Sequence, residues 1–176
     1  MFETILVPLD GSTPAEQALE QAQVIAGATG ASLVLMSVVP QRPNVPLVEA
    51  SLVPFWQLTE CQTRADQAAR YLAERARRLQ AQGLQARTKL AIGRPATEIL
   101  RTSMEQNVDL IVLATYGRSR VRRWICGSVA LEVLQDADVP VLLVRATEYH
   151  EGQPPEQYVR RLQSTTRGSA STQYGA

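Results

Sequence analysis

The residues best suited to bind an anion lie in the stretch 114–129, which reads Ala-Thr-Tyr-Gly-Arg-Ser-Arg-Val-Arg-Arg-Trp-Ile-Cys-Gly-Ser-Val. Nine residues separate Gly117 from Gly127 and Ser128. An apolar segment leads into the stretch and an amphipathic segment leaves it, which predicts a strand-to-helix junction. Free backbone N–H groups, a helix dipole and a hydroxyl at such a junction suit phosphate, and glycine lets a ligand approach the backbone. The spacing alone leaves an equally weighted alternative, in which the glycines only form tight loops and Ser128 only caps a helix.

Four arginines lie between the two glycines, at positions 118, 120, 122 and 123. Guanidinium groups pair with phosphate through charged hydrogen bonds, so a loop of this composition suits a phosphate ligand. The alternative is that these arginines only form a solvated basic loop, because the chain uses arginine almost to the exclusion of lysine and has only Lys89. We expect this alternative to apply to at least two of the four arginines. We expect Arg118 and Ser119 to face a ligand before Arg122 or Arg123.

Two further positions are expected at the same edge of the sheet as Gly117. Asp10 follows the first apolar run of the chain, and Val38 ends the second. The carboxyl ends of parallel strands form the edge where α/β proteins bind ligands. We expect the Asp10 carboxylate to accept hydrogen bonds from a ribose hydroxyl or an adenine amino group. The alternative is that Asp10 caps a helix, and we favour the ligand because Thr13 is expected to be the cap. Backbone groups of Val38 are expected to pair with a base.

Alternating apolar runs and amphipathic segments must position these residues. Short apolar runs indicate strands buried on both faces of a parallel sheet, and a 3.6-residue period indicates helices. The pattern predicts strands over 4–9, 32–39, 85–92, 109–114 and 139–144, and helices from 13 to 27 or 30, from 58 to 83, from 95 to 104 and from 129 to 137. This order predicts an α/β fold: a single doubly wound, Rossmann-like domain with a five-stranded parallel sheet and helices on both faces.

Local signals predict where helices begin and which side they bury. Thr13 is the expected N-cap of the first helix, with Pro14 at the first helical position. The inner side of the third helix is expected to carry three apolar residues, Ile99, Leu100 and Met104. Four prolines predict an irregular excursion over 40–54, and a loop of this length is often functional.

Length and composition bound the class of protein. With 176 residues, 45% hydrophobic, and a net charge of +1, the chain suits one domain and has no overall bias toward nucleic acid or anionic lipid. We expect this domain to span 1–146 and the segment 147–176 to be a polar C-terminal tail, loosely ordered or docked on a partner subunit. Two separated cysteines without CxxC spacing, and no signal sequence or long apolar stretch, predict a cytoplasmic protein that binds neither nucleic acid nor membrane.

The inventory of residues argues against several classes of enzyme. His150 is the only histidine and lies in the tail. The sequence therefore argues against a nucleotidyl transferase with an HxGH motif, against a Ser-His-Asp triad and against a zinc cluster. No GxxxxGK[ST] frame surrounds Lys89 and no GxGxxG follows the first strand, so neither a Walker loop nor a dinucleotide site is expected. We therefore assign no catalytic and no metal-binding residues, and an enzyme acting on an adenylated substrate is a minor alternative.

The chain resembles the universal stress protein family over residues 1–146. The resemblance rests on Ile-Leu-Val-Pro-Leu-Asp-Gly-Ser at 5–12, Gly-Arg-Pro-Ala at 93–96, Asp-Leu-Ile-Val-Leu at 109–113, the Gly-x9-Gly-Ser-Val segment, and Val-Pro-Val-Leu-Leu-Val at 139–144. It implies a five-stranded parallel sheet of the adenine nucleotide alpha hydrolase-like type and a homodimer formed through the last strand. In one branch of the family it also implies ATP binding through Gly-x2-Gly-x9-Gly-[Ser/Thr].

The resemblance further implies a role for each matching residue. Two residues match the contact of the first strand to adenosine, Pro8 and Asp10, and Val38 matches a backbone contact to the base. The turn beside the ribose and phosphates is matched by Gly117, Arg118 and Ser119. The cradle of the phosphates is matched by Gly127, Ser128 and Val129. The implied ligand is ATP, or else ADP, AMP or cyclic AMP, with Mg²⁺ bound through the phosphates.

Three positions depart from the ATP-binding pattern. Ala114 stands in place of the first glycine and puts a methyl group beside the nucleotide, Arg120 replaces a glycine, and Tyr116 replaces a common histidine. Because alanine is the smallest such intrusion, we expect a universal stress protein that binds an adenine nucleotide as a regulatory or sensor ligand, with little or no catalysis. The alternative is a nucleotide-free dimeric interaction module of the stress response, which docks a partner through residues 40–58 or the tail.

Overall fold

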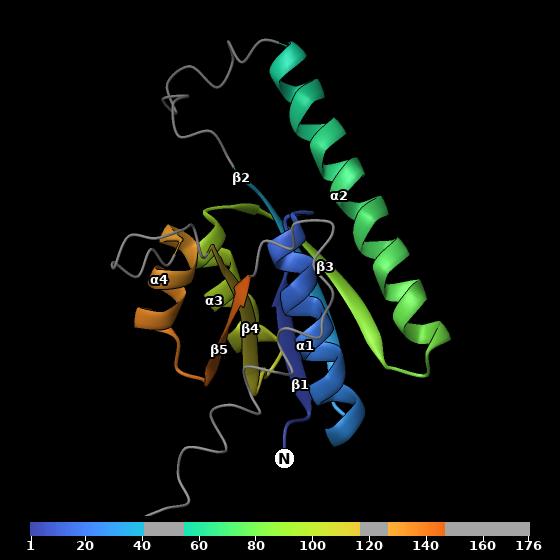
Figure 1. The fold of residues 1–176 in the computed structure, drawn as a ribbon. Helices are drawn as coiled ribbons and strands as arrows, with labels where there is room; N and C mark the ends of the chain where they lie inside the picture. Colours follow the sequence, from blue (N-terminus) through green and yellow to red (C-terminus); the bar gives the residue numbers. More distant parts are fainter. Residues whose placement is uncertain (41–54, 117–126, 147–176) are drawn as a thin grey trace, which may run out of the picture. The chain divides into compact units, whose positions relative to one another are not determined.

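A five-stranded parallel sheet with helices on both faces makes up the described part of the chain (Figure 1). The computed structural model describes residues 1–40, 55–116 and 127–146, and the side chains of all of these except 55–60 and 116. The strands are β1 (Thr4–Pro8), β2 (Ser32–Pro40), β3 (Ala86–Gly93), β4 (Leu110–Tyr116) and β5 (Val141–Ala146). The helices are α1 (Thr13–Thr29), α2 (Phe55–Ala81), α3 (Pro95–Glu105) and α4 (Ser128–Asp136).

This architecture confirms the predicted fold class. Observed ends differ from predicted ones by up to three residues, as at α2, which was expected from 58 and begins at Phe55, and at β5, which was expected from 139 and begins at Val141. The described residues belong to one compact unit, Met1–Ala146. The predictions for the excursion before α2 and for the C-terminal tail fall mostly outside the described residues.

The central strand of the sheet is shorter than its two neighbours at the carboxyl edge. The strand order is β3-β2-β1-β4-β5, so the direction in which strands are added reverses between β1 and β4. Pairing of β1 with β2 stops at Pro8, opposite Met36. By contrast, β2 pairs with β3 as far as Pro40, and β4 pairs with β5 as far as Tyr116. Ligands of open α/β sheets bind outside the carboxyl ends of the strands at such a reversal.

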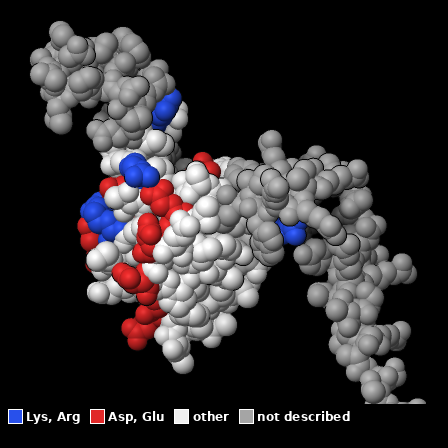
Figure 2. Space-filling model, turned by 90° about the vertical axis from the view of Figure 1, so that its left-hand side faces the viewer, with Lys and Arg blue, Asp and Glu red and all other residues white. Residues whose placement is uncertain are grey.

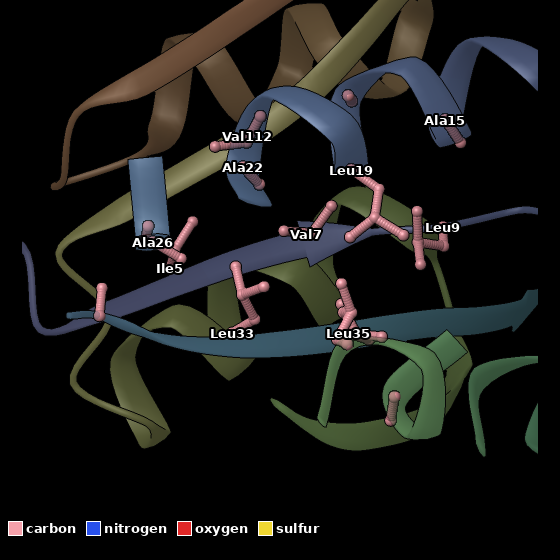
Figure 3. Packing of buried hydrophobic residues seen from close by; sticks show 14 of the residues in the cluster. Ile5, Val7, Leu9, Ala15, Leu19, Ala22, Ala26, Leu33, Leu35 and Val112 are labelled. Carbon is pink, nitrogen blue, oxygen red and sulfur yellow. The ribbon is translucent and has the colours of Figure 1, made fainter. Parts of the chain in front are cut away.

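Alternate residues of the central strands pack into two apolar layers. One layer lies against α1 and α2 and includes Ile5, Val7, Leu33 and Leu35 (Figure 3). The other layer lies against α3 and α4 and includes Leu6, Val34 and Met36. All seven side chains are at most 1% exposed. Burial on both faces explains why these strands are continuous apolar runs rather than alternating ones.

The first helix is capped by Ser12, so the prediction that Thr13 is the N-cap was wrong. The Ser12 hydroxyl accepts a hydrogen bond from Ala15 N at 3.4 Å, and Thr13 is already helical. Pro14 fits the second helical position as well as the first, because the N–H groups of the first turn have no helical partner anyway. The helix ends at Gly30, which adopts a left-handed conformation with φ of 77°.

The inner side of α3 also differs from the predicted one. Ile99 is buried and Leu100 partly buried, as expected, but Met104 is 71% exposed. The inner side is completed instead by Ala96, Thr102 and Ser103. Ser103 can lie there because its hydroxyl donates to Leu100 O at 2.8 Å, which satisfies the polar group within the helix. The sequence pattern misplaced Met104 because it counted an apolar residue at helical spacing as buried.

The starts of β1 and β4 are joined by Asp109. Its carboxylate oxygen Oδ2 accepts hydrogen bonds from Glu3 N and Thr4 N, both at 2.8 Å, and Asp109 N donates to Thr4 O at 2.9 Å. These two backbone donors, at Glu3 and then Thr4, hold the pKa of the Asp109 carboxyl below its ordinary value. The negative charge is therefore favoured by the folded state.

Because the pKa of Asp109 is lower in the folded chain, its carboxylate should stabilise the fold at neutral pH and lose that contribution in acid. At neutral pH, Asp109→Asn is expected to lower the free energy of unfolding by about 1–2 kcal/mol. The difference from the wild type should shrink as the pH falls below the ordinary carboxyl pKa of about 3.9, and vanish below the folded-state pKa. Urea unfolding across this pH range measures it, with Asp138→Asn as an exposed control. A difference that stays constant with pH would contradict the assignment.

Candidate functional site

A cleft of about 760 Å³ lies at the carboxyl edge of the sheet, above the short central strand. Its floor comes from β1 and the turn after it, and its sides come from the ends of β2 and β4, the face of α2 and the start of α4. The described lining residues are Pro8–Ser12, Pro14, Ala15, Met36–Pro40, Arg64, Gln67, Ala68, Tyr71, Pro95, Ile99, Leu113, Ala114 and Gly127–Ala130. This volume is in the range of pockets that hold nucleotide-sized ligands, about 300–1,000 Å³.

The predicted site residues that lie within the described ranges all line this one cleft. They are Pro8, Asp10, Val38, Ala114, Gly127, Ser128 and Val129. The remaining predicted positions, Gly117, Arg118 and Ser119, lie outside the described residues, as does Arg120. Residues from four separate elements are therefore brought together, as expected for groups at the same edge of a parallel sheet.

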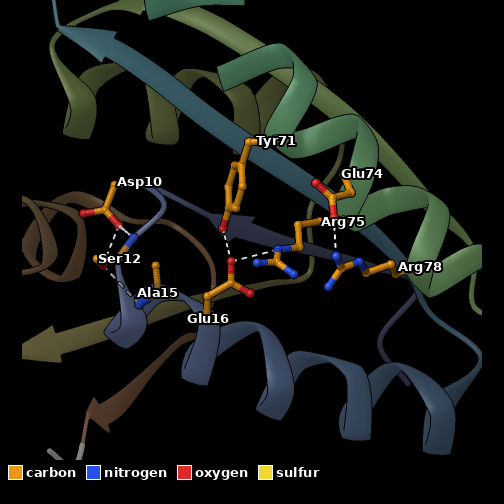
Figure 4. A network of polar contacts seen from close by, with 8 residues as sticks. All are labelled: Asp10, Ser12, Ala15, Glu16, Tyr71, Glu74, Arg75 and Arg78. Carbon is orange, nitrogen blue, oxygen red and sulfur yellow. Dashed lines mark hydrogen bonds and ion pairs between the residues drawn. The ribbon is translucent and has the colours of Figure 1, made fainter. Parts of the chain in front are cut away.

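Asp10 shapes the turn after β1 as well as lining the cleft (Figure 4). Its Oδ1 accepts hydrogen bonds from Ser12 N at 3.0 Å and from the Ser12 hydroxyl at 2.6 Å. The cap of α1 is Ser12 and not Thr13, so the presence of a Thr13 cap is no reason to assign Asp10 to a ligand. The assignment now depends on exposure: Asp10 is exposed, and its Oδ2 has no hydrogen bond with any described residue. One carboxylate oxygen holds the turn, and the other faces no described partner.

The backbone around Val38 lies beyond the part of β2 that pairs with β1. The β1 ladder ends opposite Met36, and a last bond runs from Leu9 N to Met36 O at 2.7 Å. Val38 pairs only with Ala91 of β3. Backbone N–H and C=O groups of β2 beyond Met36 therefore have no partner on β1 and border the cleft. A backbone contact to a base needs groups placed in this way.

The start of α4 has the features of an anion site. Gly127 is its N-cap residue and makes no side-chain cap, and Ser128, the first helical residue, does not cap the helix either. The first-turn N–H groups of α4 thus have no side-chain acceptor among the described residues. Gly127 has φ of −54°, which any residue adopts, and an added Cβ there would meet no atom of the described residues within 4 Å. None of the described residues requires a glycine at this position, whereas close approach of a ligand to the backbone would.

Ala114 lies on β4 opposite Val144 and is partly buried. Its methyl group packs against the layer formed with α1 and α2, and the residue also lines the cleft. The methyl group of Ala114, which stands where the ATP-binding pattern has a glycine, is therefore partly buried in the apolar core.

The helix α2 forms a wall of the cleft that the sequence patterns did not indicate. Four of its residues, Arg64, Gln67, Ala68 and Tyr71, line the cleft. Their spacing of three, four and seven residues places them on one side of the helix. That spacing is a signal in the sequence, but the polar members among them resembled the solvated side of an amphipathic helix.

A polar cluster fixes this part of α2 against α1 (Figure 4). The Tyr71 hydroxyl donates a hydrogen bond to Glu16 Oε1, and Arg75 Nε contacts the same oxygen at 2.9 Å. The Arg75 guanidinium also lies over the Tyr71 ring, 5.3 Å from its centroid. Burial, reinforced by the Glu16 carboxylate, raises the pKa of the Tyr71 hydroxyl, so the hydroxyl remains a donor. The cluster holds the Tyr71 turn of α2 beside the cleft.

The described residues contain no group of three or more His, Cys, Asp or Glu side chains placed to hold a metal ion. None of the described helices is long and apolar enough to cross a membrane. The predicted cytoplasmic location stays a prediction.

Comparison with known proteins agrees with this arrangement. The model of the universal stress protein family matches residues 1–145 of the chain. The universal stress protein YxiE of Bacillus subtilis is 33% identical over 148 residues, which cover 82% of this chain and 100% of that protein. The universal stress protein UspA from Lactobacillus plantarum has a similar fold, with a TM-score of 0.69 and 24% identity over 82% of this chain and 98% of that one.

Two solved structures with the same fold are complexes with adenine nucleotides. One is a universal stress protein in complex with cAMP, with a TM-score of 0.54 and 23% identity over 83% of this chain and 98% of that one. The other is the universal stress protein from Archaeoglobus fulgidus in complex with dAMP, with a TM-score of 0.56 and 19% identity over 81% of this chain and 97% of that one. The family model spans nearly all of the described sheet and helices, and the chain belongs to the universal stress protein family.

Proposed function

We propose that this chain binds an adenine nucleotide in the cleft as a regulatory or sensor ligand. The observation that carries the proposal is the start of α4, where first-turn N–H groups without a side-chain cap border the cleft beside a glycine that no described residue requires. Helix N-termini of this kind bind phosphate. Family members of the same fold in complex with cAMP and dAMP support the choice of an adenine nucleotide.

In this proposal each described site residue has a distinct task. The phosphates lie against Gly127, Ser128 and Val129, where backbone N–H groups and a hydroxyl are available. The free Oδ2 of Asp10 accepts from a ribose hydroxyl. Backbone groups at Val38 pair with the base, and Pro8 and Ala114 contact the nucleoside from β1 and β4. Gly117, Arg118 and Ser119 are proposed to complete the phosphate side. ATP is the preferred ligand, and Mg²⁺ would be held through its phosphates.

Catalysis is expected to be minor. Asp10 is the only carboxylate among the described lining residues, and one of its oxygens is already bonded to Ser12. A general base needs a free acceptor within hydrogen-bond reach of the attacking water. The other oxygen of Asp10 is assigned here to the ribose, so no carboxylate oxygen of the described lining residues is left for that task. Hydrolysis at a rate typical of dedicated ATPases, abolished by Asp10→Ala, would contradict this part of the proposal.

The nucleotide proposal is tested by identifying small molecules released from the natively purified protein by mass spectrometry, followed by titration calorimetry with ATP, ADP, AMP and cyclic AMP. We expect saturable binding of at least one of these nucleotides. No heat and no saturation with any of them at millimolar concentration would overturn the proposal.

A second candidate function, a nucleotide-free dimeric interaction module, is favoured by one surface. Seen from the α4 side, Asp and Glu side chains form a line that borders a broad area without charge (Figure 2). Three leucines of α4 and β5 are at least 37% exposed, namely Leu131, Leu134 and Leu142. β5 is also an edge strand of the sheet, and exposed apolar edges are normally covered.

We propose a homodimer through β5. Light scattering should show a dimer for the wild type and a monomer for Leu142→Asp. A monomeric wild type would overturn it.

A further inference from the structure

The cleft-facing side of α2 carries the only positive charge among the described lining residues. Of those residues only Asp10 and Arg64 are charged. Arg64 has no hydrogen bond or ion pair with any described residue. Arg75, about three turns further along the same helix, differs because it contacts Glu16. Arg64 therefore borders the cleft with its donors unmatched by any described acceptor.

The position of Arg64 along α2 places it over the outer part of the cleft. Tyr71, two turns further along the helix, is fixed to Glu16 of α1. Seven residues of helix span about 10 Å, and the N-terminal part of α2 extends past the carboxyl ends of the strands (Figure 1). Arg64 thus stands about two turns farther out than Tyr71, on the same side of the helix as Ala68, and all three residues line the cleft.

A guanidinium group in this place has a specific chemical use. It presents five donors and no acceptor, so it does not complete a hydrogen-bonded pair with the donor groups at the start of α4. It does match an anion held between the two, because phosphoryl oxygens accept from helix N–H groups and from arginine together. The cleft is therefore lined by donors from two separate elements, the Arg64 guanidinium of α2 and the first-turn N–H groups of α4.

We propose that Arg64 binds the phosphate groups of the nucleotide and sets the preference of the site for ligands with more phosphate charge. This inference rests on the proposed function, because it names a residue of that same site. Arg64 acts from α2, the element that the sequence motifs of the binding site do not include. Its contribution should increase from adenosine to AMP, ADP and ATP, and should be screened by salt.

The test compares Arg64→Ala with Arg70→Ala in the full-length chain. Arg70 is exposed on the same helix and has no bond with a described residue, but it does not line the cleft. Affinities for adenosine, AMP, ADP and ATP are measured by calorimetry at low and high salt, and circular dichroism melts verify that both variants fold. We expect Arg64→Ala to weaken ATP binding by about tenfold, to weaken AMP binding less and to leave adenosine binding within a factor of two. Arg70→Ala should match the wild type throughout.

The outcomes separate this inference from the proposed function. If the wild type binds ATP and the two variants bind it equally well, the role of Arg64 is wrong while the proposed function stands. If Arg64→Ala loses adenosine and ATP affinity by the same factor, Arg64 contacts the nucleoside and the phosphate assignment is overturned. If the wild type binds no nucleotide, the proposed function is overturned, and this inference with it.

Discussion

Replacing Gly127 with alanine is expected to weaken the binding of adenine nucleotides by roughly tenfold to a hundredfold without unfolding the protein. The added methyl group enters space beside the cleft that no described residue fills, since a Cβ at this position meets no atom of the described residues within 4 Å. In that space it would hold a phosphate away from the first N–H groups of α4, where short hydrogen bonds to charged oxygens are strongest. Calorimetry with ATP measures the loss.

The stability of Gly127→Ala should stay close to that of the wild type. Gly127 has φ of −54°, so alanine adopts its backbone conformation without strain. Alanine is a poorer N-cap than glycine, but it also reduces the entropy of the unfolded chain, and each effect is about 1 kcal/mol or less. The two effects oppose one another, so a change in nucleotide affinity would not come from a damaged fold.

Gly27→Ala provides the matched control. Gly27 lies exposed within α1, outside the cleft, and a Cβ there also meets nothing within 4 Å. Alanine is a better helix former, so the free energy of unfolding should rise by about 0.5–1 kcal/mol while nucleotide affinity stays unchanged. Equal nucleotide affinity in wild type and Gly127→Ala would show that no ligand group approaches the start of α4, and would contradict the cradle assignment.

The largest effect on stability is expected for Met36→Ala. Met36 is fully buried on β2, in the layer that packs against α3 and α4. Its truncation removes apolar contacts and leaves a cavity that neighbours fill only in part, which should lower the free energy of unfolding by about 2–5 kcal/mol. Urea denaturation followed by circular dichroism gives the value.

Met104→Ala makes the same chemical change on the surface. Met104 is 71% exposed on α3, so its truncation should change the free energy of unfolding by about 0.5 kcal/mol at most. The pair therefore tests the orientation of α3, which the sequence pattern had placed with Met104 inward. A loss at Met104 as large as the loss at Met36 would mean that Met104 packs against a neighbour after all.

Most of the fold followed from local patterns. The strands were predictable because both of their faces are buried, for example Leu6 on one face and Val7 on the other, so the strands form continuous apolar runs. The errors arose where a local rule had two solutions. Ser12 and Thr13 are both acceptable caps. In the structure Ser12 is the cap, and it also donates two hydrogen bonds to Asp10. Met104 has helical spacing to Leu100, yet the position of α3 on the sheet leaves it exposed.

The candidate site was predictable in part for the same reason. Asp10 follows and Gly127 precedes an element with a clear pattern, and Val38 lies near the end of another. Parallel strands bring their carboxyl ends to one edge. The wall formed by α2 was not predictable from such patterns. Arg64 and Gln67 differ in no local feature from the exposed polar residues beside them, and only their place beside the cleft distinguishes them.

The sequence by itself determined the order of strands and helices, the membership in the universal stress protein family and the residues at the carboxyl ends of β1, β2 and β4. These properties depend on periodicity and on short motifs, which act over a few residues. Only the tertiary structure decided that β1 ends short of its neighbours, that the start of α4 has no side-chain cap, and that α2 closes one side of the cleft. The position of α2 beside the cleft depends on contacts such as that between Tyr71 and Glu16, which are 55 residues apart in the sequence, and no local pattern specifies such a contact.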